Sequence, residues 1–542
     1  MIEFKTIAKN KIFLSVLSGI LLSLTWTDYP VGVLVLIAFV PLLIILEQIL
    51  KTNNKSGGLV FFSYSFLSFL IWNAFSTWWI MYASIPGAIA TICLNSFFMA
   101  FVMYLSFISF KTLGRKIGYL VFVSNWVAFE YLLIHSQLSW PWMILGNSFS
   151  NSISLIQWYE FTGHLGGSAW IMTVNILIFE TVRQIAKKSE KKKIRSYIIG
   201  LSLLILLPIS YSLIRFFTYK EKVNPVKVVI IQPNIDPYNE KFSTPTLSQI
   251  QKTTEIAKTA SNNPPDYFIA PETAITTGFY EDNALQNISV NHILDFLKDY
   301  PKSEFIIGAT TRVKYDNPKD YTETATISED NTFAHDLFNT SMQISPNADI
   351  QFYHKSKLVP GIESMPFPII TKLFTDSFVE LGGINGTHGT QENRTVFVNN
   401  SNDIRLGVAV CYESAYGEFI TEFISAGANV LFIITNDGWW KDSQGYRQHA
   451  RFAKLRAIET RRSIARSANT GISCIINQKG QIAKQTEWWK EDAIVGIINA
   501  NDKTTFYVKY GDFIPRMGLM ISIILLAIII VGQIRKRITN KT

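Results

Sequence analysis

The chain has 542 residues, 48% of them hydrophobic and 17% charged, and it carries a formal net charge of +9. Many of the Lys and Arg residues flank apolar runs and no nucleic-acid motif is present, so the charge indicates a lipid partner and argues against nucleic acid. The odd, sparse set of three cysteines, Cys93, Cys411 and Cys474, does not predict a disulfide framework.

Long apolar runs fill most of the first 217 residues, and one more lies near the C-terminus. A helix needs about 20 apolar residues to cross the hydrocarbon core, so we expect each run to be a membrane span. The first run is short and follows lysines, as in a signal peptide, but no cleavage pattern follows it, so we expect it to be retained. The eight expected spans are residues 12–28, 31–50, 58–80, 86–110, 117–134, 165–182, 196–217 and 514–533.

The Lys and Arg residues between these runs alternate from one side to the other. Cytoplasmic loops of membrane proteins carry an excess of Lys and Arg. If the N-terminus is cytoplasmic, every inside segment is basic and the short outside loops, including 135–167, hold no Lys or Arg, which places residues 220–512 outside the cytoplasm. The inside residues are Lys5, Lys9, Lys11, Lys51, Lys55, Lys111, Arg115, Lys116, the run at 183–195, Arg535, Lys536, Arg537 and Lys541.

The outside segment at 135–167 is rich in tryptophan. It contains Trp140, Trp142 and Trp158. Such side chains settle at the membrane–water boundary, so the segment is either an interfacial anchor or a lipid-facing wall beneath the soluble domain.

Residues 220–512 read like a soluble domain in which β-branched runs alternate with helical patterns. Continuous apolar runs, such as those at 228–231 and 430–434, predict strands buried on both faces and hence a layered α/β domain. The expected strands are 226–232, 267–270, 305–309, 337–344, 394–398, 406–410, 430–435, 472–476 and 494–498, and the expected helices are 246–260, 283–299, 415–426 and 446–464.

The expected fold is therefore an α-helical transmembrane bundle of about eight spans combined with an α/β domain. Three parts are expected: a membrane domain of seven spans over 1–219, an extracytoplasmic α/β domain over 220–512, and a closing span with a basic tail over 513–542.

Three residues suited to catalysis lie near the ends of expected strands. Glu272 follows the strand at 267–270, and Cys411 lies where a strand gives way to a helix. At such a turn, backbone N–H groups and the helix dipole favour a thiolate. Lys355 lies in Tyr-His-Lys-Ser-Lys-Leu-Val-Pro, where Lys357 competes for the same role. Taken singly, the three are explained as a solvated carboxylate, a small core residue and a surface lysine.

Together, these residues reproduce the order of the Glu, Lys and Cys of the nitrilase superfamily. The stretch from Lys355 to Glu363 resembles the superfamily's Lys-x-x-Leu-Val-Pro-Phe-Gly-Glu, with Glu363 as its second glutamate. Thr-Asn-Asp-Gly-Trp-Trp at 435–440 resembles its Ser-Asn-Asp-Ala-Trp-Phe, and residues 448–462 and 466–471 also match.

With the expected spans around this domain, the sequence resembles the apolipoprotein N-acyltransferase family over essentially its whole length. It departs from that family at Gly361 and Ile362, where the family has Phe-Gly. The tryptophan of the family's first active-site loop has no clear counterpart near residues 238–242, within the divergent loop at 236–245.

The resemblance implies a nitrilase-like αββα sandwich that transfers an acyl group by a ping-pong mechanism. Glu272 would act as general base on Cys411, whose thiolate would attack the ester of a phospholipid. Lys355 and the backbone N–H of Tyr412 would hold the oxyanion. The α-amino group of a diacylglyceryl-cysteine at the N-terminus of an apolipoprotein would then accept the acyl group from the thioester. This implies the last step of bacterial lipoprotein maturation, at the inner membrane, with the catalytic domain outside the cytoplasm.

Four further residues and one loop are expected to assist. Glu363 either supports Lys355 or a loop hinge, or is an ordinary exposed carboxylate. Glu413 either orients the amine or the lysine, or forms a structural salt bridge. Tyr412 and Trp439 either line the pocket or simply pack. The loop at 360–373 forms either a lid or acyl groove, or a plug for the core. Its apolar side chains are Ile362, Met365, Phe367, Ile369 and Ile370.

No cofactor and no metal are expected. The seven histidines show no metal-ligand spacing, and His449 lies in a basic helix without an evident partner. No glycine-rich phosphate loop is present. Cys93 and Cys474 are interpreted as apolar filler.

Two other functions fit part of the pattern. A membrane-anchored nitrilase-like amidase would share the three central residues, but it has no need of seven preceding spans or an apolar lid. A catalytically decayed scaffold that binds lipoproteins would not be expected to keep Glu272, Lys355 and Cys411 in register.

Overall fold

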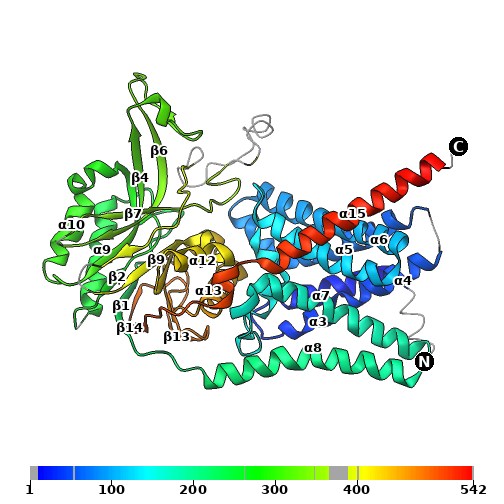
Figure 1. Cartoon of the computed structure of the whole chain (residues 1–542). Helices are drawn as coiled ribbons and strands as arrows, with labels where there is room; N and C mark the ends of the chain where they lie inside the picture. The colour runs from blue at the N-terminus through cyan, green and yellow to red at the C-terminus, as the bar shows by residue number, and fades with distance from the viewer. Residues whose placement is uncertain are drawn as a thin grey trace. The chain divides into compact units, whose positions relative to one another are not determined.

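A computed structural model describes residues 10–52, 55–261, 263–346, 348–364, 366, 388–399 and 402–539, without the side chains of residues 536 and 537. The chain divides into two compact units (Figure 1). The helical unit comprises Met1–Met81, Ile85–Thr218 and Tyr510–Thr542, and the α/β unit comprises Tyr219–Lys509 together with Tyr82–Ser84.

The apolar runs form long helices in the helical unit. Among the described residues, six helical segments are long and apolar enough to cross a membrane, which confirms the predicted helical bundle. These segments are Gly32–Thr52, Gly57–Tyr82, Ile85–Ile134, Tyr159–Ala186, Lys191–Thr218 and Phe513–Arg535. The helices are α2 (Lys11–Leu24), α3 (Val35–Ala38), α4 (Val40–Thr52), α5 (Gly57–Thr77), α6 (Ile85–Ile134), α7 (Tyr159–Ala186), α8 (Lys191–Thr218) and α15 (Phe513–Thr539).

Two details differ from a simple count of eight spans. The backbone of α6 turns at Gly114, where φ is 76° and ψ is 178°, so its two halves account for the expected spans at 86–110 and 117–134. Glycine adopts positive φ without a steric penalty. The first expected span, 12–28, ends early because α2 has only 14 residues. At about 1.5 Å per residue it is roughly 21 Å long, short of the roughly 30 Å hydrocarbon core.

A buried asparagine joins the broken helix formed by α3 and α4 to α7. The side-chain carbonyl of Asn175 accepts the N–H of Phe39 at 2.8 Å, and its amide donates to the carbonyl of Val35 at 2.9 Å. Backbone polar groups within a bilayer must be satisfied inside the protein. Asn175 therefore makes the helix break tolerable in an apolar environment.

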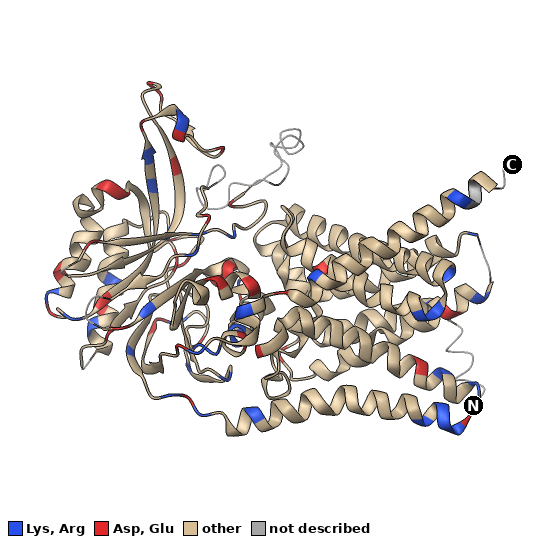
Figure 2. Cartoon of the chain, viewed as in Figure 1, with Lys and Arg blue, Asp and Glu red and all other residues tan. Residues whose placement is uncertain are grey.

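Several charged residues lie together toward one end of the helical unit (Figure 2). Arg115, next to the bend of α6, pairs with Glu47 of α4 and lies 2.9 Å from Glu180 of α7. Arg183 lies 3.3 Å from Glu47 and 3.1 Å from Glu180. The C-terminal parts of α4 and α7 and the bend of α6 therefore lie at the same end of this unit.

The α/β unit contains two sheets. The first has the order β14-β1-β2-β4-β6-β5, with β3 beside β4 and β7 beside β6, and the second has the order β13-β12-β11-β10-β9-β8. Strands β1, β2 and β4 are parallel, as are β9, β10 and β11. The strands are β1 (Pro225–Gln232), β2 (Tyr267–Ile269), β3 (Ile275–Tyr280), β4 (Glu304–Tyr315), β5 (Thr326–Ile327), β6 (Ala334–Ile344), β7 (Gln351–His354), β8 (Phe397–Val398), β9 (Arg405–Val410), β10 (Val430–Thr435), β11 (Ile464–Ala468), β12 (Cys474–Ile476), β13 (Ile482–Gln485) and β14 (Asp492–Asn499).

Helices cover the outer faces of the two sheets, which confirms the predicted αββα sandwich (Figure 1). The aromatic rings of Tyr267 and Phe432 meet edge to face between the sheets, 5.4 Å apart. On the outer side of the first sheet, Ile250 and Val290 are fully buried against apolar strand residues such as Phe268. The helices are α9 (Thr246–Ala260) and α10 (Ile288–Leu297) on the first sheet, and α12 (Gly417–Ser425) and α13 (Gln444–Thr460) on the second.

Most of the expected strands and helices of this unit are present, with some corrections. The expected helix at 446–464 is wrong at its end, since α13 stops at Thr460 and Ile464 begins β11. The expected helix at 283–299 is divided into a short 3-10 segment and α10. The strand expected at 394–398 is limited to Phe397–Val398, and β3, β5, β7, β11 and β13 were not predicted.

Candidate active site

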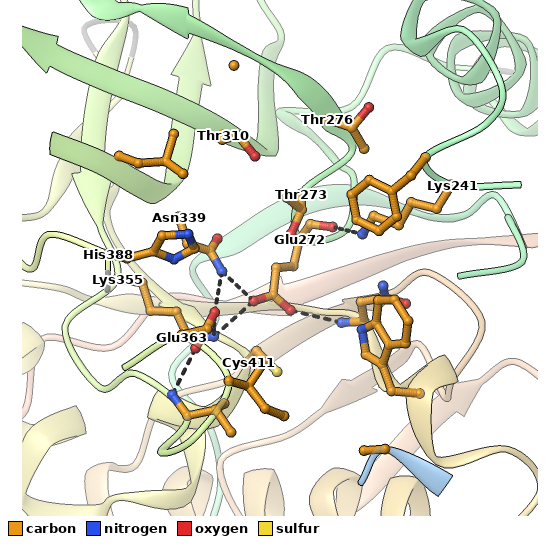
Figure 3. Close-up of a pocket in the computed structure, with 18 of the residues that line it drawn as sticks. Lys241, Glu272, Thr273, Thr276, Thr310, Asn339, Lys355, Glu363, His388 and Cys411 are labelled. Carbon is orange, nitrogen blue, oxygen red and sulfur yellow. Dashed lines mark hydrogen bonds and ion pairs between the residues drawn. The ribbon is translucent and has the colours of Figure 1, made fainter. Parts of the chain in front are cut away.

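A pocket of about 280 Å³ lies at the carboxyl ends of strands from both sheets (Figure 3). Glu272 comes after β2, Lys355 after β7 and Cys411 directly after β9. Ligand sites of α/β folds form at this end of parallel strands. The pocket wall includes Lys241, Glu272, Asn339, Lys355, Glu363 and Cys411.

Glu272 reaches the pocket through a tight turn held against β4. Gly308 of β4 donates its N–H to the carbonyl of Pro271 at 3.1 Å and accepts the N–H of Ala274 at 2.8 Å. A Cβ added at Gly308 would lie 2.6 Å from the Cα of Glu272 and 2.4 Å from the backbone N of Thr273. Only glycine therefore allows the turn to approach β4 this closely, and the approach fixes the backbone that carries the carboxylate.

Two carboxylates share the same pair of donors in the pocket (Figure 3). The Nζ of Lys355 donates to Oε1 of Glu272 at 3.0 Å and to Oε1 of Glu363 at 2.8 Å. The amide of Asn339 donates to the same two oxygens, at 2.8 Å and 2.9 Å. The backbone N–H of Asn436 donates to the other oxygen of Glu272 at 3.1 Å. This network fixes the separation and orientation of both carboxylates.

The electrostatics of this network keep Lys355 charged. Burial alone would lower the pKa of Lys355, but the charges of Glu272 and Glu363 outweigh burial and raise its pKa well above the usual value. Burial would raise the pKa of Glu363, but the neighbouring Lys355 ammonium outweighs it and lowers that pKa. Lys355 is therefore an ammonium group at neutral pH and can stabilise a negative charge that develops beside it.

Cys411 occupies a strained turn at the start of a 3-10 segment, Cys411–Ala415. Its φ is 51°, in the left-handed region that residues other than glycine rarely adopt. Burial, aided by the charge of Glu272, raises the pKa of its thiol far above the ordinary value, although Lys355 opposes the rise. The thiol of Cys411 is therefore neutral at rest, and a role as nucleophile would require a base to accept its proton at the moment of attack.

Glu413 fastens this turn to the segment that carries Lys355. One oxygen of its carboxylate accepts the N–H of Val410 at 2.7 Å. The other accepts the N–H of Ser356 at 2.7 Å and the hydroxyl of Tyr353 at 2.8 Å. Glu413 is fully buried and has no ion pair with any described residue, so of the two roles considered for it, the structural salt bridge is not found. These hydrogen bonds set the position of Cys411 relative to Lys355.

A buried polar cluster lies behind Cys411. Nδ1 of His449 is 2.9 Å from Asp437, and its Nε2 is 3.0 Å from the carbonyl oxygen of Cys411 and 2.9 Å from the hydroxyl of Ser414. The expectation that His449 lacks a partner is therefore wrong. The guanidinium of Arg466 lies 2.6 Å from Asp437 and 3.2 Å from the His449 ring, so a cation is already present here. We assign no metal to this cluster of thiol, carboxylate and imidazole.

A lysine and an aromatic wall that were not predicted complete the pocket. Lys241 is buried, and its Nζ donates to the backbone carbonyl of Glu272 at 3.2 Å. Burial lowers the pKa of Lys241 to about 8, against the opposing charge of Glu272. Phe242 stacks on the predicted Trp439 at 6.5 Å, and Tyr238 meets the same ring edge to face at 5.4 Å. The loop that diverges from the family thus supplies two aromatic rings beside the pocket.

Some predicted residues do not line the pocket. Tyr412 is buried and packs on Tyr416, with the ring centroids 5.4 Å apart. Lys357 places its Nζ over the rings of Tyr416 and Phe419, at 5.3 Å and 5.7 Å, so Lys355 is the lysine that faces the carboxylates.

The apolar loop at 360–373 lies mostly outside the described residues, including Met365, Phe367, Ile369 and Ile370. Ile362 is described and lines the pocket. Of the other cysteines, Cys474 is buried as expected, whereas Cys93 is exposed on α6 and does not fill a core.

Known proteins resemble this chain along nearly its full length. Residues 18–177 match the family profile described as Apolipoprotein N-acyltransferase N-terminal domain, and residues 227–505, more than half of the chain, match the profile described as Carbon-nitrogen hydrolase. The chain is 29% identical to an apolipoprotein N-acyltransferase of Chlorobaculum tepidum over 97% of each chain. It is 26% identical to one of Geobacter metallireducens over 94% of each chain. A solved amidase of the nitrilase superfamily from Nesterenkonia aligns with a TM-score of 0.36 and 12% identity, covering 53% of this chain and 95% of that one.

Proposed function

This chain belongs to the carbon–nitrogen hydrolase family, and from that premise we propose that it is an apolipoprotein N-acyltransferase, which completes the maturation of bacterial lipoproteins. The reaction moves a fatty acyl group from a phospholipid to the α-amino group of a diacylglyceryl-cysteine. The observation that carries the proposal is that the half-buried Cys411 and the buried Lys355 and Glu272 line one pocket of a chain that also has a membrane-type helical unit. The names of the relatives over nearly the full length support the same substrate classes.

The first half of the reaction acylates the enzyme. Glu272 accepts the proton of the Cys411 thiol as the sulfur attacks the ester carbonyl of the phospholipid, forming a C–S bond. The ammonium of Lys355 and a backbone N–H at Tyr412 stabilise the oxyanion, and loss of one such donor typically costs about 3 kcal/mol of barrier. The C–O bond to the glycerol then breaks, and Glu272 returns its proton to the departing alkoxide. A lysophospholipid leaves and a thioester remains.

The second half passes the acyl group to the acceptor. The free α-amino group attacks the thioester carbonyl and forms a C–N bond, while Glu272 takes up the proton that the nitrogen loses. The C–S bond breaks, and the sulfur of Cys411 is protonated again. Glu363 and Asn339 do not touch the reacting atoms in this scheme, but they position Lys355 and Glu272 through the hydrogen bonds described above.

We further propose that the α/β unit lies outside the cytoplasm of the bacterial inner membrane. The gathering of Arg115, Arg183 and their partners at one end of the helical unit supports a common side for the segments near 51–55, 111–116 and 183–195. These are the segments whose positive charge marks the cytoplasmic side. Within this proposal, residues 1–219, 220–512 and 513–542 are the membrane domain, the catalytic domain and the closing span.

Intact-mass measurement tests the chemistry directly. Detergent-purified protein is incubated with a mixture of phosphatidylethanolamine and phosphatidylglycerol, and wild type is compared with Cys411→Ala and with Cys474→Ala as the matched thiol control. We expect a gain of one fatty acyl mass in wild type and Cys474→Ala that neutral hydroxylamine removes, and no gain in Cys411→Ala. A synthetic diacylglyceryl lipopeptide is expected to discharge the adduct. Absence of any adduct, with a thiol that still reacts with small activated esters, would point to an amidase or a scaffold.

A further inference from the structure

Besides Lys241, the pocket contains a second cation, Arg312, that forms no ion pair with any residue the structure describes, and the reaction scheme above does not use it. Arg312 of β4 lines the pocket and is half-buried. Its Nη1 donates to the backbone carbonyl of Gly278 at 3.0 Å. Among the described residues, no carboxylate lies within ion-pair distance of Arg312. Within the part of the chain that the structure describes, one guanidinium donor is used by the protein, which leaves the others for a ligand.

The neighbouring strand leaves space for this guanidinium. A Cβ added at Gly278 would lie 2.9 Å from Nη1 of Arg312 and 3.2 Å from its Cζ. The absence of a side chain at Gly278 lets the planar group lie against the backbone of β3. On β4, Thr310 has the same facing as Arg312, because side chains two residues apart point to one side of a strand, and Thr310 also lines the pocket.

Strand register places Arg312 one step beyond the catalytic carboxylates. Thr310 pairs with Asn339, whose amide binds both Glu272 and Glu363, and Arg312 pairs with Leu337. Two residues along a strand correspond to about 7 Å. Arg312 therefore lies on the pocket wall about 7 Å along β4 from Thr310, the residue level with Asn339. The buried Lys241, by contrast, lies directly beside Glu272.

We propose that Arg312 binds the phosphodiester of the acyl donor, an inference that rests on the proposed phospholipid-dependent function. In a glycerophospholipid only the glycerol backbone separates the scissile ester from the phosphate. An ester bound at Cys411 therefore brings the phosphate within reach of the part of the pocket wall that holds Arg312. Arginine offers a planar fork of donors that matches phosphate oxygens in a bidentate manner. A half-buried position also suits a charged headgroup, which has to stay partly hydrated, better than the fully buried Lys241 does.

Kinetics of thioester formation test this subsite in the full-length enzyme. Arg312→Gln is compared with wild type, with Arg312→Lys, and with Lys314→Gln, an exposed residue of the same strand that pairs with Asp316 and does not line the pocket. The acyl donors are phosphatidylglycerol and the neutral ester p-nitrophenyl octanoate. We expect Arg312→Gln to raise the KM for phosphatidylglycerol on the order of 10- to 100-fold, with kcat and the neutral ester little changed. Arg312→Lys is expected to be intermediate, and Lys314→Gln to match wild type.

The other outcomes separate the two levels of the argument. If wild type reacts with the neutral ester but not with phospholipid, the proposed function and the phosphate subsite both fail. If phospholipid acylates wild type and Arg312→Gln with equal KM, only the subsite fails. Equal losses toward both donors would make Arg312 a structural residue and overturn the proposal. So would a defect confined to discharge of the thioester by lipopeptide, which would assign Arg312 to the acceptor.

Discussion

Replacing Lys355 by methionine should destabilise the α/β unit through the carboxylates it leaves behind. Methionine keeps the length of the side chain but removes the ammonium that lies 3.0 Å from Glu272 and 2.8 Å from Glu363. The Lys355 side chain is only 1% exposed, so water cannot take over its role. Glu363 is then a buried carboxylate held by an amide and a backbone N–H, without its cation.

The expected magnitude follows from the burial of the pair. Removing one partner of a buried ion pair costs about 3–5 kcal/mol, because the remaining charge stays desolvated. At roughly 2 °C per kcal/mol for a domain of this size, the Tm of Lys355→Met falls by about 6–10 °C near neutral pH. Adding Glu363→Gln removes the stranded charge, so the double variant should recover about 2 kcal/mol relative to Lys355→Met.

The dependence on pH should also change in the variant. In the native chain the pKa of Glu363 is lowered from 4.5, so its contribution to stability is present above that value and is lost as the pH falls through the lowered pKa. In Lys355→Met, the Lys355 ammonium, the strongest group that opposes the effect of burial, is gone, and the pKa of Glu363 rises. Protonation then relieves the buried charge, so this variant should gain stability as the pH falls from about 8 to about 5, whereas the native chain should not.

Thermal unfolding of the four proteins in detergent, followed by tryptophan fluorescence at several pH values, measures this cycle. The fourth protein, Glu363→Gln alone, completes the double-mutant cycle. Effects of Lys355→Met and Glu363→Gln that add within about 0.5 kcal/mol would refute the reasoning, because they would show no energetic coupling between the two residues. The same holds if the stability of Lys355→Met falls with decreasing pH as it does in wild type.

Three further predictions concern other parts of the site. Lys241→Met should slow thioester formation about tenfold at pH 7. It should also abolish a fall in the rate of thioester formation above about pH 8, where the native Lys241 amine loses its charge. A pH–rate profile of the variant that keeps this fall would show that Lys241 does not cause it. Gly308→Ala should lower the rate of enzyme acylation about 100-fold in single-turnover mass measurements, because the added methyl displaces the turn that carries the base, and an unchanged rate would show that the turn adapts. Asp437→Asn should cost about 3–5 kcal/mol in thermal unfolding by leaving Arg466 buried without its anion. The exposed Asp442→Asn should cost less than about 1 kcal/mol, and equal losses in the two variants would rule out the buried pair as the cause.

The meeting of Glu272, Lys355 and Cys411 in one pocket could be predicted because they lie within short motifs, whereas their hydrogen-bond partners could not. Asn339 is a single polar residue within β6 and contacts the carboxylates only because β6 pairs with β4. Lys241 is one of many lysines, and nothing near it in the sequence indicates that it is buried. Arg312 depends in the same way on the register between β3 and β4. Sequence motifs therefore identify site residues that lie close to one another in the chain. Residues such as Asn339 and Arg312 reach the site through strand pairing, which the sequence does not reveal.

The fold shows the same division between strong and weak signals. Strands buried on both faces, such as β1 and β10, read clearly as continuous apolar runs. The strand β13 was missed because all of its residues are exposed and it includes Lys484 and Gln485. The end of α13 was misplaced because the helix is followed by Arg461, which adopts a left-handed conformation with φ of 50°. Glycine is the usual residue at such a position, so nothing in the sequence signals that the helix ends there.

The raised pKa of Cys411 has a consequence for the durability of the protein in an oxidising compartment. Oxidants attack thiolates far more readily than thiols, so the half-buried Cys411, which rests as a neutral thiol, is protected from conversion to sulfenic and sulfinic acids. Cys474, the other cysteine of the α/β unit, is buried, and burial raises its pKa to about 11. If the α/β unit lies outside the cytoplasm as proposed, both thiols would therefore resist oxidation there, and in the proposed scheme the sulfur of Cys411 becomes reactive only while Glu272 holds its proton.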